Sequence, residues 1–598
     1  MSTPSSPPRT LYHGGRVLTL DPGDRPHDAL VTAGERVLGL GPLADMRSLA
    51  GPAAATVDLD GTWLMPGLVD AHPHAMHFAA FGLGAVDLFD AVDFDDIVQR
   101  IAARAAVTPP GEWIVCTPIG EPHYFARRDH TALAERRMPD RHVLDRAAPG
   151  HPVWLMAWAP RTPNVCAFNS PALARLNLTR HTPAQVEHVW IEKDDDSGEP
   201  TGVLRGKVNN YYNDDPFWHA LSKNLPGVPD ALWPLAGVAG VQAANALGVT
   251  ALYEAHAMMP PHLEAYHAIE AQGLLTARVV MAPELSSYAF ATMDYPEAEV
   301  WDLLEYGHSH QQPRGEHLRT VGVTLSRGGP LSQGYLRMND PYPGPFGALT
   351  RGTTFLGRHV ERRVVEYCLA HDLRLNMVIG GYRDHDDFFR TLAETTTPDA
   401  IRPREWVLQH CYFTAPAHVR AAHAHGLHVT SSPSFVYGKA DVVRERFPPA
   451  VAADFIALRS MMDGGLNVAC GTDWGPANPW RQIALAETRE SAHSGHHHLE
   501  SGQGLERLQA LHTFTRNGGG VMQWPALGRL ARGGPADFVV VDRDPLGGDA
   551  GALAATRVLR TVLGGAAVYD AGGLQGGPLA LPEPAAALVA RATAPSDA

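Results

Sequence analysis

Residues 67–74 read Gly-Leu-Val-Asp-Ala-His-Pro-His, a short apolar run that ends in two histidines two residues apart. An apolar run of this length directly after a Pro-Gly turn is typical of a buried strand. Side chains two apart on a strand point to the same side, so His72 and His74 can bind one metal ion together. A hydrogen-bonded pair without a metal is the alternative interpretation.

Seven further apolar segments follow this one along the chain. Helical stretches separate them, and they end near Glu254, Met281, Leu325, Ile379, His410, Ser432 and Asp473. The alternation predicts a parallel sheet, and eight strand–helix units are the number that closes a TIM-type (β/α)8 barrel. Functional residues in such a barrel lie at the carboxyl ends of its strands, where these histidines and Asp473 fall. The predicted fold class is α/β.

The same pattern divides the chain into parts. The barrel is predicted over residues 67–529, with an inserted cap subdomain at about 80–240. Residues 11–66 and 530–575 both contain β-branched runs that end in glycine turns, which predicts one small β-sandwich built from the two ends. Two terminal segments are expected to lack stable order, a disordered N-terminus at residues 1–10 and a poorly ordered tail at residues 576–598.

Charge and composition exclude several classes of partner. The 64 acidic residues outnumber the 49 basic ones, and the net charge of -15 argues against nucleic acid, since phosphate binding depends on clustered Lys and Arg. No apolar run approaches the roughly 18 residues of a membrane span, and residues 1–10 lack the apolar core of a secretory signal. The five cysteines are odd in number and widely spaced, unlike a disulfide framework. We therefore expect a cytoplasmic protein that binds a small-molecule substrate.

Four motifs, taken together, resemble the amidohydrolase superfamily. They are PGLVDAHPH at 66–74, QHC at 409–411, GTDW at 471–474 and GGPADFVVVD at 533–542. Two others, CAFNSPAL at 166–173 and PTGVLRG at 200–206, resemble its YtcJ-like branch, which includes N-substituted formamide deformylases. The resemblance implies hydrolysis of a carbon–nitrogen bond in a non-peptide amide, formamide or cyclic amide by a metal-activated water. It also suggests a homodimer.

The resemblance carries roles to four residues of this chain. His72, His74, Asp473 and His410 would hold Zn²⁺, most simply one ion per chain, although another divalent metal is compatible. Asp473 would take the proton from the water and pass it to the leaving nitrogen. His410 would be a ligand or would polarise the substrate carbonyl. The alternatives are a helix cap for Asp473 and a hydrogen-bonded core residue for His410.

Two positions depart from the superfamily pattern. Many members bridge two metals with a carboxylated lysine on strand four and use a histidine on strand five, but here Thr324 and the segment 376–380 stand at those places. This makes a lysine-bridged pair of metals improbable. Glu254 and His256, two apart at the end of strand two, are candidates to complete the metal shell. Alternatively, Glu254 orients a ligand histidine and His256 lies in the following loop.

Other candidates concern the substrate. Lys439 and Tyr437, after strand seven, are expected as substrate contacts, although a solvated loop explains them nearly as well. His496, His497 and His498 are interpreted as part of a solvated loop. Five tryptophans suggest an apolar or aromatic substrate if they do not simply form the core of the insertion. They are Trp113, Trp154, Trp158, Trp190 and Trp218.

Two other functions compete with hydrolysis. The same metal-polarised carbonyl serves a lyase, hydratase, isomerase or decarboxylase, because a fold does not fix a reaction. A non-catalytic descendant that only binds a ligand would show a degraded centre, whereas His72, His74, His410 and Asp473 are all present.

Overall fold

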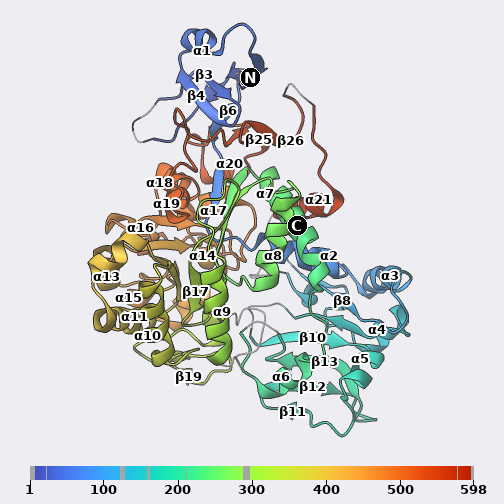
Figure 1. Ribbon diagram of the computed structural model, residues 1–598. Coiled ribbons are helices and arrows are strands. Elements are labelled where there is room, and N and C mark those ends of the chain that lie inside the picture. Colours follow the sequence, from blue (N-terminus) through green and yellow to red (C-terminus); the bar gives the residue numbers. More distant parts are fainter. Residues whose placement is uncertain are drawn as a thin grey trace.

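The computed structural model describes residues 7–21, 23, 25–120, 128–157, 162–209, 212–286, 297–574 and 577–593. The chain is an α/β protein whose small β region, at the top of Figure 1, adjoins a larger part built of alternating strands and helices. A separate sheet with its own helices lies to one side of that larger part. Among the described residues, no helix is long and apolar enough to cross a membrane.

All eight segments expected as strands of the large part contain strands, and the fourth is divided into two, β16 and β17, which gives nine strands in all. They form two parallel sheets, in the orders β16-β15-β14-β7 and β17-β20-β21-β22-β23. Their bounds are β7 Leu68–Asp70, β14 Val249–Glu254, β15 Arg278–Met281, β16 Leu318–Thr320, β17 Val323–Ser326, β20 Leu375–Ile379, β21 Val407–His410, β22 His428–Ser431 and β23 Val468–Cys470.

Backbone hydrogen bonds join the two parallel sheets at both edges. At one edge the Ala71 amide donates to the Cys470 carbonyl over 3.1 Å, which places β7 beside β23. At the other edge the Thr324 amide donates to the Pro283 carbonyl over 2.9 Å, which places β17 beside the end of β15. The carboxyl ends of the strands at both edges therefore face the same end of the structure.

A helix follows each of the eight segments, namely α2 (Ala75–Gly84), α8 (Pro260–Ala271), α9 (Glu297–Ser309), α10 (Arg358–Ala370), α11 (Tyr382–Thr395), α13 (Pro416–Ala424), α14 (Ser434–Arg446) and α17 (Pro479–Thr488). Helix α10 shows why they pack on the strands. Its buried residues Val360, Val364 and Cys368 are four apart and form one apolar stripe, whereas Arg362 on the other side is exposed. All six residues of β14 are buried, as expected for a parallel strand covered on both faces.

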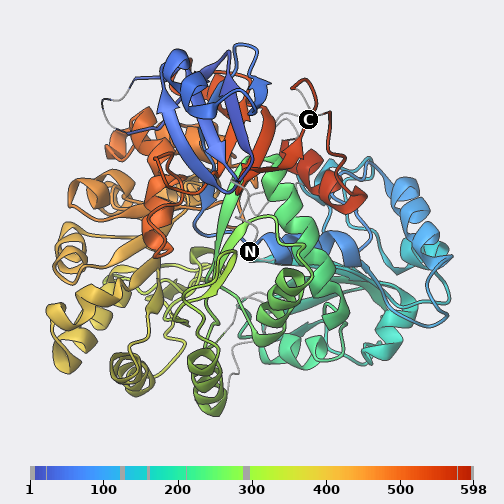
Figure 2. The same cartoon turned by 45° about the horizontal axis from the view of Figure 1, so that its top comes forward.

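The small β region combines both ends of the chain, and Figure 2 shows the blue N-terminal strands beside the red C-terminal ones. One sheet has the order β4-β3-β1-β5 and the other the order β2-β6-β24-β25-β26. Their bounds are β1 Arg9–His13, β2 Arg16–Val17, β3 Ala29–Ala33, β4 Arg36–Gly41, β5 Ala55–Asp58, β6 Trp63–Pro66, β24 Phe538–Val541, β25 Val558–Leu563 and β26 Ala566–Asp570.

Side chains of both sheets share one core, in which Tyr12 and Phe538 meet edge to face at 5.0 Å. The N-terminus was expected to be disordered over residues 1–10. Its last two residues are instead ordered, because β1 begins at Arg9 and pairs with β3. Residues 1–6 lie outside the described residues.

The insertion lies between α2 and α7 (Trp233–Ala246), the helix that leads into β14. Its six-stranded sheet has the order β11-β12-β13-β10-β9-β8 and is antiparallel except between β8 and β9. The strands are β8 Ile114–Cys116, β9 Val153–Leu155, β10 Asn164–Phe168, β11 Gln185–Val186, β12 Val189–Lys193 and β13 Pro200–Gly206. The helices are α3 Phe94–Ala105, α4 Arg141–Ala147, α5 Ser170–Arg175 and α6 Pro216–Ser222.

The tail expected to be poorly ordered, residues 576–598, instead contains helix α21, Glu583–Thr593. Both ribbon views place this red helix near the green helix α7. Ala585 is fully buried, and Leu588 packs on the main core. Arg591 forms an ion pair with Asp87 of the insertion. The Ala-rich composition therefore supports a packed helix here, since alanine has the highest helix propensity.

A buried ion pair ties the parallel strands to the small β region. Arg278 of β15 donates to both carboxylate oxygens of Asp537, at 2.6 and 3.1 Å, and both side chains are 3% exposed. Asp537→Asn should lower the free energy of unfolding by about 3 kcal/mol, because it leaves a buried guanidinium without its counter-charge. Urea denaturation followed by tryptophan fluorescence measures the change.

The matched control is Glu366→Gln, which removes the partner of Arg362 in an ion pair whose side chains are about half exposed. That change should cost less than about 1 kcal/mol. Equal losses of stability in the two variants would contradict the special role of the buried pair.

Candidate metal centre

The carboxylate of Asp70, at the end of β7, brings two loops together. Its Oδ1 accepts hydrogen bonds from the amides of His72 at 3.2 Å and Thr472 at 3.0 Å, and its Oδ2 accepts from the Thr472 hydroxyl at 2.6 Å. The Asp473 amide in turn donates to the His72 carbonyl at 2.8 Å. The loop that carries His72 and His74 is thereby held against the loop after β23 that carries Asp473.

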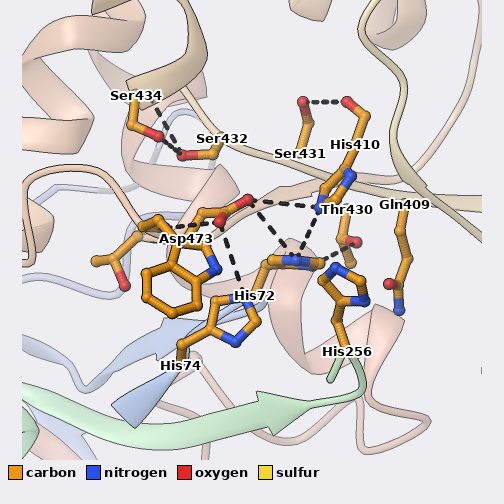
Figure 3. A network of polar contacts seen from close by, with 12 residues as sticks. His72, His74, His256, Gln409, His410, Thr430, Ser431, Ser432, Ser434 and Asp473 are labelled. Atoms are coloured by element: carbon orange, nitrogen blue, oxygen red, sulfur yellow. Dashed lines mark hydrogen bonds and ion pairs between the residues drawn. The ribbon is translucent and has the colours of Figure 1, made fainter. Parts of the chain in front are cut away.

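Five side chains converge at this point (Figure 3). The Nε2 atoms of His72 and His410 are 3.1 Å apart. Oδ2 of Asp473 lies 3.7 Å from His72 Nε2 and 3.5 Å from His410 Nε2, and its Oδ1 lies 3.7 Å from His74 Nε2. His72, His74 and His256 form one group whose potential ligand atoms lie within 4.8 Å of one another, and His72, His410 and Asp473 form another. All five residues are buried.

The backbone is left-handed at three residues of the site. His410, Cys411 and Asp473 have φ values of 69°, 52° and 50°. Non-glycine residues in this region cost of order 1 kcal/mol each and persist only where the surroundings hold them. Here the Ser431 hydroxyl holds the His410 carbonyl at 2.8 Å, and the Cys411 amide donates to the Ile379 carbonyl at 3.0 Å. The strain turns His410 and Asp473 toward the centre as their strands end.

Burial sets the protonation of the cluster. It holds the pKa of His72, His74 and His410 well below the ordinary 6.5, and neighbouring histidines lower it further. These three imidazoles are therefore neutral near pH 7, with lone pairs available to a metal. Burial also raises the pKa of Asp473 to about 6, although the charges of His256 and other nearby groups oppose the shift.

The chemistry of these donors fits a divalent metal. Within the described part of the chain, the buried atoms His74 Nε2, His256 Nε2 and Asp473 Oδ2 make no hydrogen bond. An unsatisfied buried polar group costs about 1–3 kcal/mol, so the arrangement calls for a cation at this point. Neutral imidazoles with one carboxylate are a zinc-type donor set.

His256 reaches the cluster from the loop after β14, and a second carboxylate orients it. Its Nδ1 lies 2.9 Å from Oε2 of Glu284, whose other oxygen accepts a hydrogen bond from Ser326. Burial alone lowers the pKa of His256, but the carboxylates of Glu284 and Asp473 outweigh it and raise the pKa above 6.5. A metal-ligating histidine commonly bonds to a carboxylate through its other nitrogen. Sequence reasoning missed Glu284, because it follows strand three without any motif.

Glu254 does not join the cluster, although it stands two residues before His256. Its Oε1 accepts a hydrogen bond from the hydroxyl of Tyr266 on α8 at 2.9 Å, and burial raises its pKa to about 7. β14 ends at Glu254, and Ala257 just beyond has a φ of 59°. Because the strand has ended, residues two apart here need not point to the same side. The expectation that Glu254 and His256 share one orientation is therefore wrong.

The two residues expected to contact the substrate also point in different directions. Lys439 and Tyr437 lie on α14, not in a loop, and residues two apart on a helix point to different sides. The Lys439 ammonium donates to the Tyr412 hydroxyl at 3.2 Å. Burial lowers the pKa of Lys439 to about 8, although the negative charge of Asp473 opposes this shift. Tyr437 instead accepts a hydrogen bond from Arg481 of α17 at 2.6 Å. Lys439 is therefore near the cluster and Tyr437 is turned away from it.

Strands four and five supply no ligand within the described chain. The Thr324 hydroxyl, at the position of the superfamily lysine, donates to the Ala255 carbonyl. Asn376 on β20 accepts a hydrogen bond from the hydroxyl of Tyr253 at 2.6 Å. Both side chains are thus engaged in structural hydrogen bonds.

A largely apolar cavity of about 640 Å³ adjoins the cluster at His74. Its aromatic wall includes Phe78, Phe81, Trp113, Trp154, Trp233 and Trp474. Helix α21 closes part of it with Leu588, Arg591 and Ala592. Only some of the tryptophans expected to face the substrate therefore line this cavity. Trp113 and Trp154 line the cavity, Trp218 lies in the core of the insertion, Trp190 is partly exposed, and Trp158 lies outside the described residues.

Comparison with known proteins confirms the resemblance indicated by the motifs. A model of the amidohydrolase family matches residues 55–569. N-substituted formamide deformylase of Arthrobacter pascens is 24% identical, and the match covers 93% of this chain and 97% of that protein. Putative amidohydrolase YtcJ of Bacillus subtilis is 23% identical, with 94% and 99% covered.

Solved structures share the fold. An uncharacterized metal-dependent hydrolase of Pyrococcus furiosus matches with a TM-score of 0.68 at 21% identity, covering 90% of this chain and 100% of that chain. Atrazine chlorohydrolase TrzN of Arthrobacter aurescens, solved in complex with zinc, matches with a TM-score of 0.52 at 14% identity, covering 98% and 100%. At these identities the likeness shows the fold alone.

The contact between Glu284 and His256 generates a prediction about metal affinity. Glu284→Gln should weaken binding of a metal at the cluster by about 10–100-fold, because the neutral amide no longer supports the imidazole through Nδ1. Competition with a chromogenic chelator measures the affinity. Ser326→Ala, which removes only the hydroxyl on the other oxygen of Glu284, should change it less. Unchanged affinity in Glu284→Gln would remove His256 from the ligand set.

Proposed function

The chain belongs to the amidohydrolase family, and we propose that it is a metal-dependent hydrolase that cleaves the carbon–nitrogen bond of a non-peptide amide or formamide. One observation carries the proposal. Three neutral imidazoles, a fourth histidine supported by Glu284 and the carboxylate of Asp473 meet in a buried cluster that leaves metal-binding atoms unsatisfied. Both the family and the N-substituted formamide deformylase relative support hydrolysis at this centre.

We propose further that the eight strands act as one closed (β/α)8 barrel. The hydrogen bonds from Ala71 to Cys470 and from Thr324 to Pro283 support this arrangement. In such a barrel the residues at the carboxyl ends of the strands form the active site. His72, His256, His410 and Asp473 all follow or end strands at that side.

The metal we propose is one Zn²⁺ ion, held by His72, His74, His410 and Asp473, with His256 as a further ligand. Imidazole and carboxylate donors suit zinc, and the zinc complex of a structural relative is consistent with this choice. When bound, zinc acts as a Lewis acid, polarising a carbonyl and lowering the pKa of water to about 7. The absence of a lysine at Thr324 favours one ion over a bridged pair.

Asp473 is suited to move the proton. Burial raises its pKa to about 6, so its carboxylate can accept a proton near neutral pH and release it again to a leaving nitrogen. Lys439 faces the same carboxylate from α14 and is 7% exposed, so its charge acts in a dry environment. His410, held by its strained backbone, is placed to bind the metal or to donate to the developing oxyanion.

The cavity beside His74 suggests the chemical class of the substrate. Its aromatic and aliphatic walls fit an apolar group attached to the nitrogen or acyl carbon, and Trp474 packs beside His74 where the cavity meets the cluster, with the two ring centroids 5.0 Å apart. Such walls contribute roughly 25 cal/mol for each Å² of apolar surface removed from water. The small-molecule substrate, the homodimer and the cytoplasmic location remain predictions.

Metal analysis tests the centre directly. Natively purified protein should contain about one zinc per chain by inductively coupled plasma mass spectrometry. His72→Ala combined with His74→Ala should remove that zinc and all turnover, because two neutral ligands are lost. His142→Ala combined with His181→Ala, two exposed positions of the insertion, is the matched control. Full zinc occupancy in the first double variant would refute the ligand assignment.

The role of Asp473 predicts a separate effect on catalysis. Asp473→Asn should lower kcat by at least about 100-fold, since an amide cannot take up the proton. Release of amine from a panel of N-alkyl and N-aryl formamides and amides measures the rate, and circular dichroism checks the fold. An active Asp473→Asn variant would contradict the proton-transfer role. A zinc-loaded wild type that hydrolyses none of these compounds would favour a lyase or isomerase instead.

A further inference from the structure

A histidine-rich hairpin follows α17, shortly after Asp473 in the sequence. It begins at Glu490, which pairs with His497 across the hairpin, and the Ser491 amide donates to the His496 carbonyl at 2.8 Å. Asp441 of α14 anchors it, because its carboxylate accepts hydrogen bonds from Ser491 and from the Ser494 hydroxyl, the latter at 2.7 Å. The segment expected as a solvated loop is therefore a structured element fixed to a helix.

Three ligand-type side chains converge at the end of this hairpin. Oε1 of Glu500 lies 3.4 Å from Nε2 of His496 and 3.6 Å from Nδ1 of His498. The two imidazole rings meet edge to face with centroids 4.6 Å apart. Potential ligand atoms of all three residues lie within 4.8 Å of one another. Ligands around a tetrahedral zinc are separated by about 3.3 Å, so only small shifts would bring these atoms to one ion.

His498 differs from an ordinary surface histidine. It is only 7% exposed, and within the described structure its Nε2 makes no hydrogen bond. That nitrogen lies 3.7 Å from Oδ1 of Asp441, whereas Nδ1 on the other side of the ring faces Glu500. A metal-ligating histidine typically binds the ion through one nitrogen and donates from the other to a carboxylate. His498 has a carboxylate on each side of its ring, and the 3.7 Å between Nε2 and Asp441 would have to shorten to a hydrogen bond when a metal binds at Nδ1.

We propose that His496, His498 and Glu500 form a second metal site, separate from the cluster at His72, with Asp441 as the outer carboxylate that positions His498. Two imidazoles and one carboxylate select a divalent transition metal such as Zn²⁺ or Ni²⁺, with water completing the coordination. The partial exposure of His496 and Glu500 leaves the site open to solvent ions. The proposal does not depend on the reaction at the first centre.

Occupation of this site would act on α14. Asp441 holds the hairpin from one side of that helix, and the Ala492 amide donates to the Tyr437 carbonyl of the same helix at 2.7 Å. Lys439, between these two residues in sequence, points toward Tyr412 near the first centre. A metal that fixes the hairpin therefore restrains the helix that carries Lys439. Because the ion binds the folded chain, it should also raise the melting temperature as its concentration rises.

The experiment uses the full-length holoprotein and Ni²⁺ as the probe. Calorimetric titration should show one further equivalent of Ni²⁺ per chain while the metal of the first centre, followed by mass spectrometry, stays bound. His496→Ala combined with Glu500→Gln should abolish this uptake. The matched control is His493→Ala combined with His497→Ala, which removes two exposed histidines of the same hairpin and should leave the uptake intact.

Asp441 requires its own test, because it acts through His498 and also anchors the hairpin. Asp441→Asn should weaken Ni²⁺ binding by about tenfold, and Asp441→Glu should restore part of the affinity. The melting temperature of each variant without added Ni²⁺ separates this effect from a loss of structure. A wild type that takes up no further Ni²⁺ overturns the proposal. Equal loss of uptake in the two double variants, which indicates nonspecific binding to a histidine tract, also overturns it.

Discussion

The hydrogen bonds of Asp70 are the constraint on which the centre depends. One carboxylate holds the His72 amide and both donors of Thr472, so it fixes the loop after β7 against the loop after β23. The approach is so close that a Cβ atom on Gly471 would lie 2.2 Å from the His72 nitrogen. Only glycine fits there. Asp70 and Thr472, which are 402 residues apart in sequence, thereby meet, and the left-handed backbone of Asp473 turns its side chain toward His72 and His74.

Local pattern was sufficient to predict strands in all eight segments and to name the five converging residues, His256 as one of two candidates to complete the metal shell, because strand periodicity and strand-end placement are properties of short segments. It failed where the chain leaves regular structure. Strand alternation was extended past Glu254, although β14 ends there, so the partnership of His256 with Glu284 was missed. Tyr437 was expected beside Lys439, but α14 separates them by helical geometry. Contacts between distant loops leave no periodic signal in the sequence.

The apolar cavity is another feature that the sequence pattern could not predict, because segments from different parts of the chain form it. Its walls come from α2, the insertion, the loop after β23 and helix α21, and the lining residues extend in sequence from Asp70 to Ala592. The tail was expected to be poorly ordered because it is a chain end rich in Ala and Pro. A small buried face and one ion pair from Arg591 to Asp87 are nevertheless enough to hold α21 against α2 and α7. Tertiary packing thus decides whether such a segment folds.

Charge balance in the buried centre argues for one divalent ion rather than two. His72, His74 and His410 are neutral, so the negative charges at the cluster are those of Asp473, of Glu284 behind His256 and of Asp70, whose carboxylate accepts a hydrogen bond from the His72 amide. The proposed dication and the ammonium of Lys439 together offset these three carboxylates. A second dication would find neither the lysine-derived bridge nor Glu254, whose carboxylate bonds to Tyr266. Its charge would remain uncompensated in a low-dielectric site, which is costly.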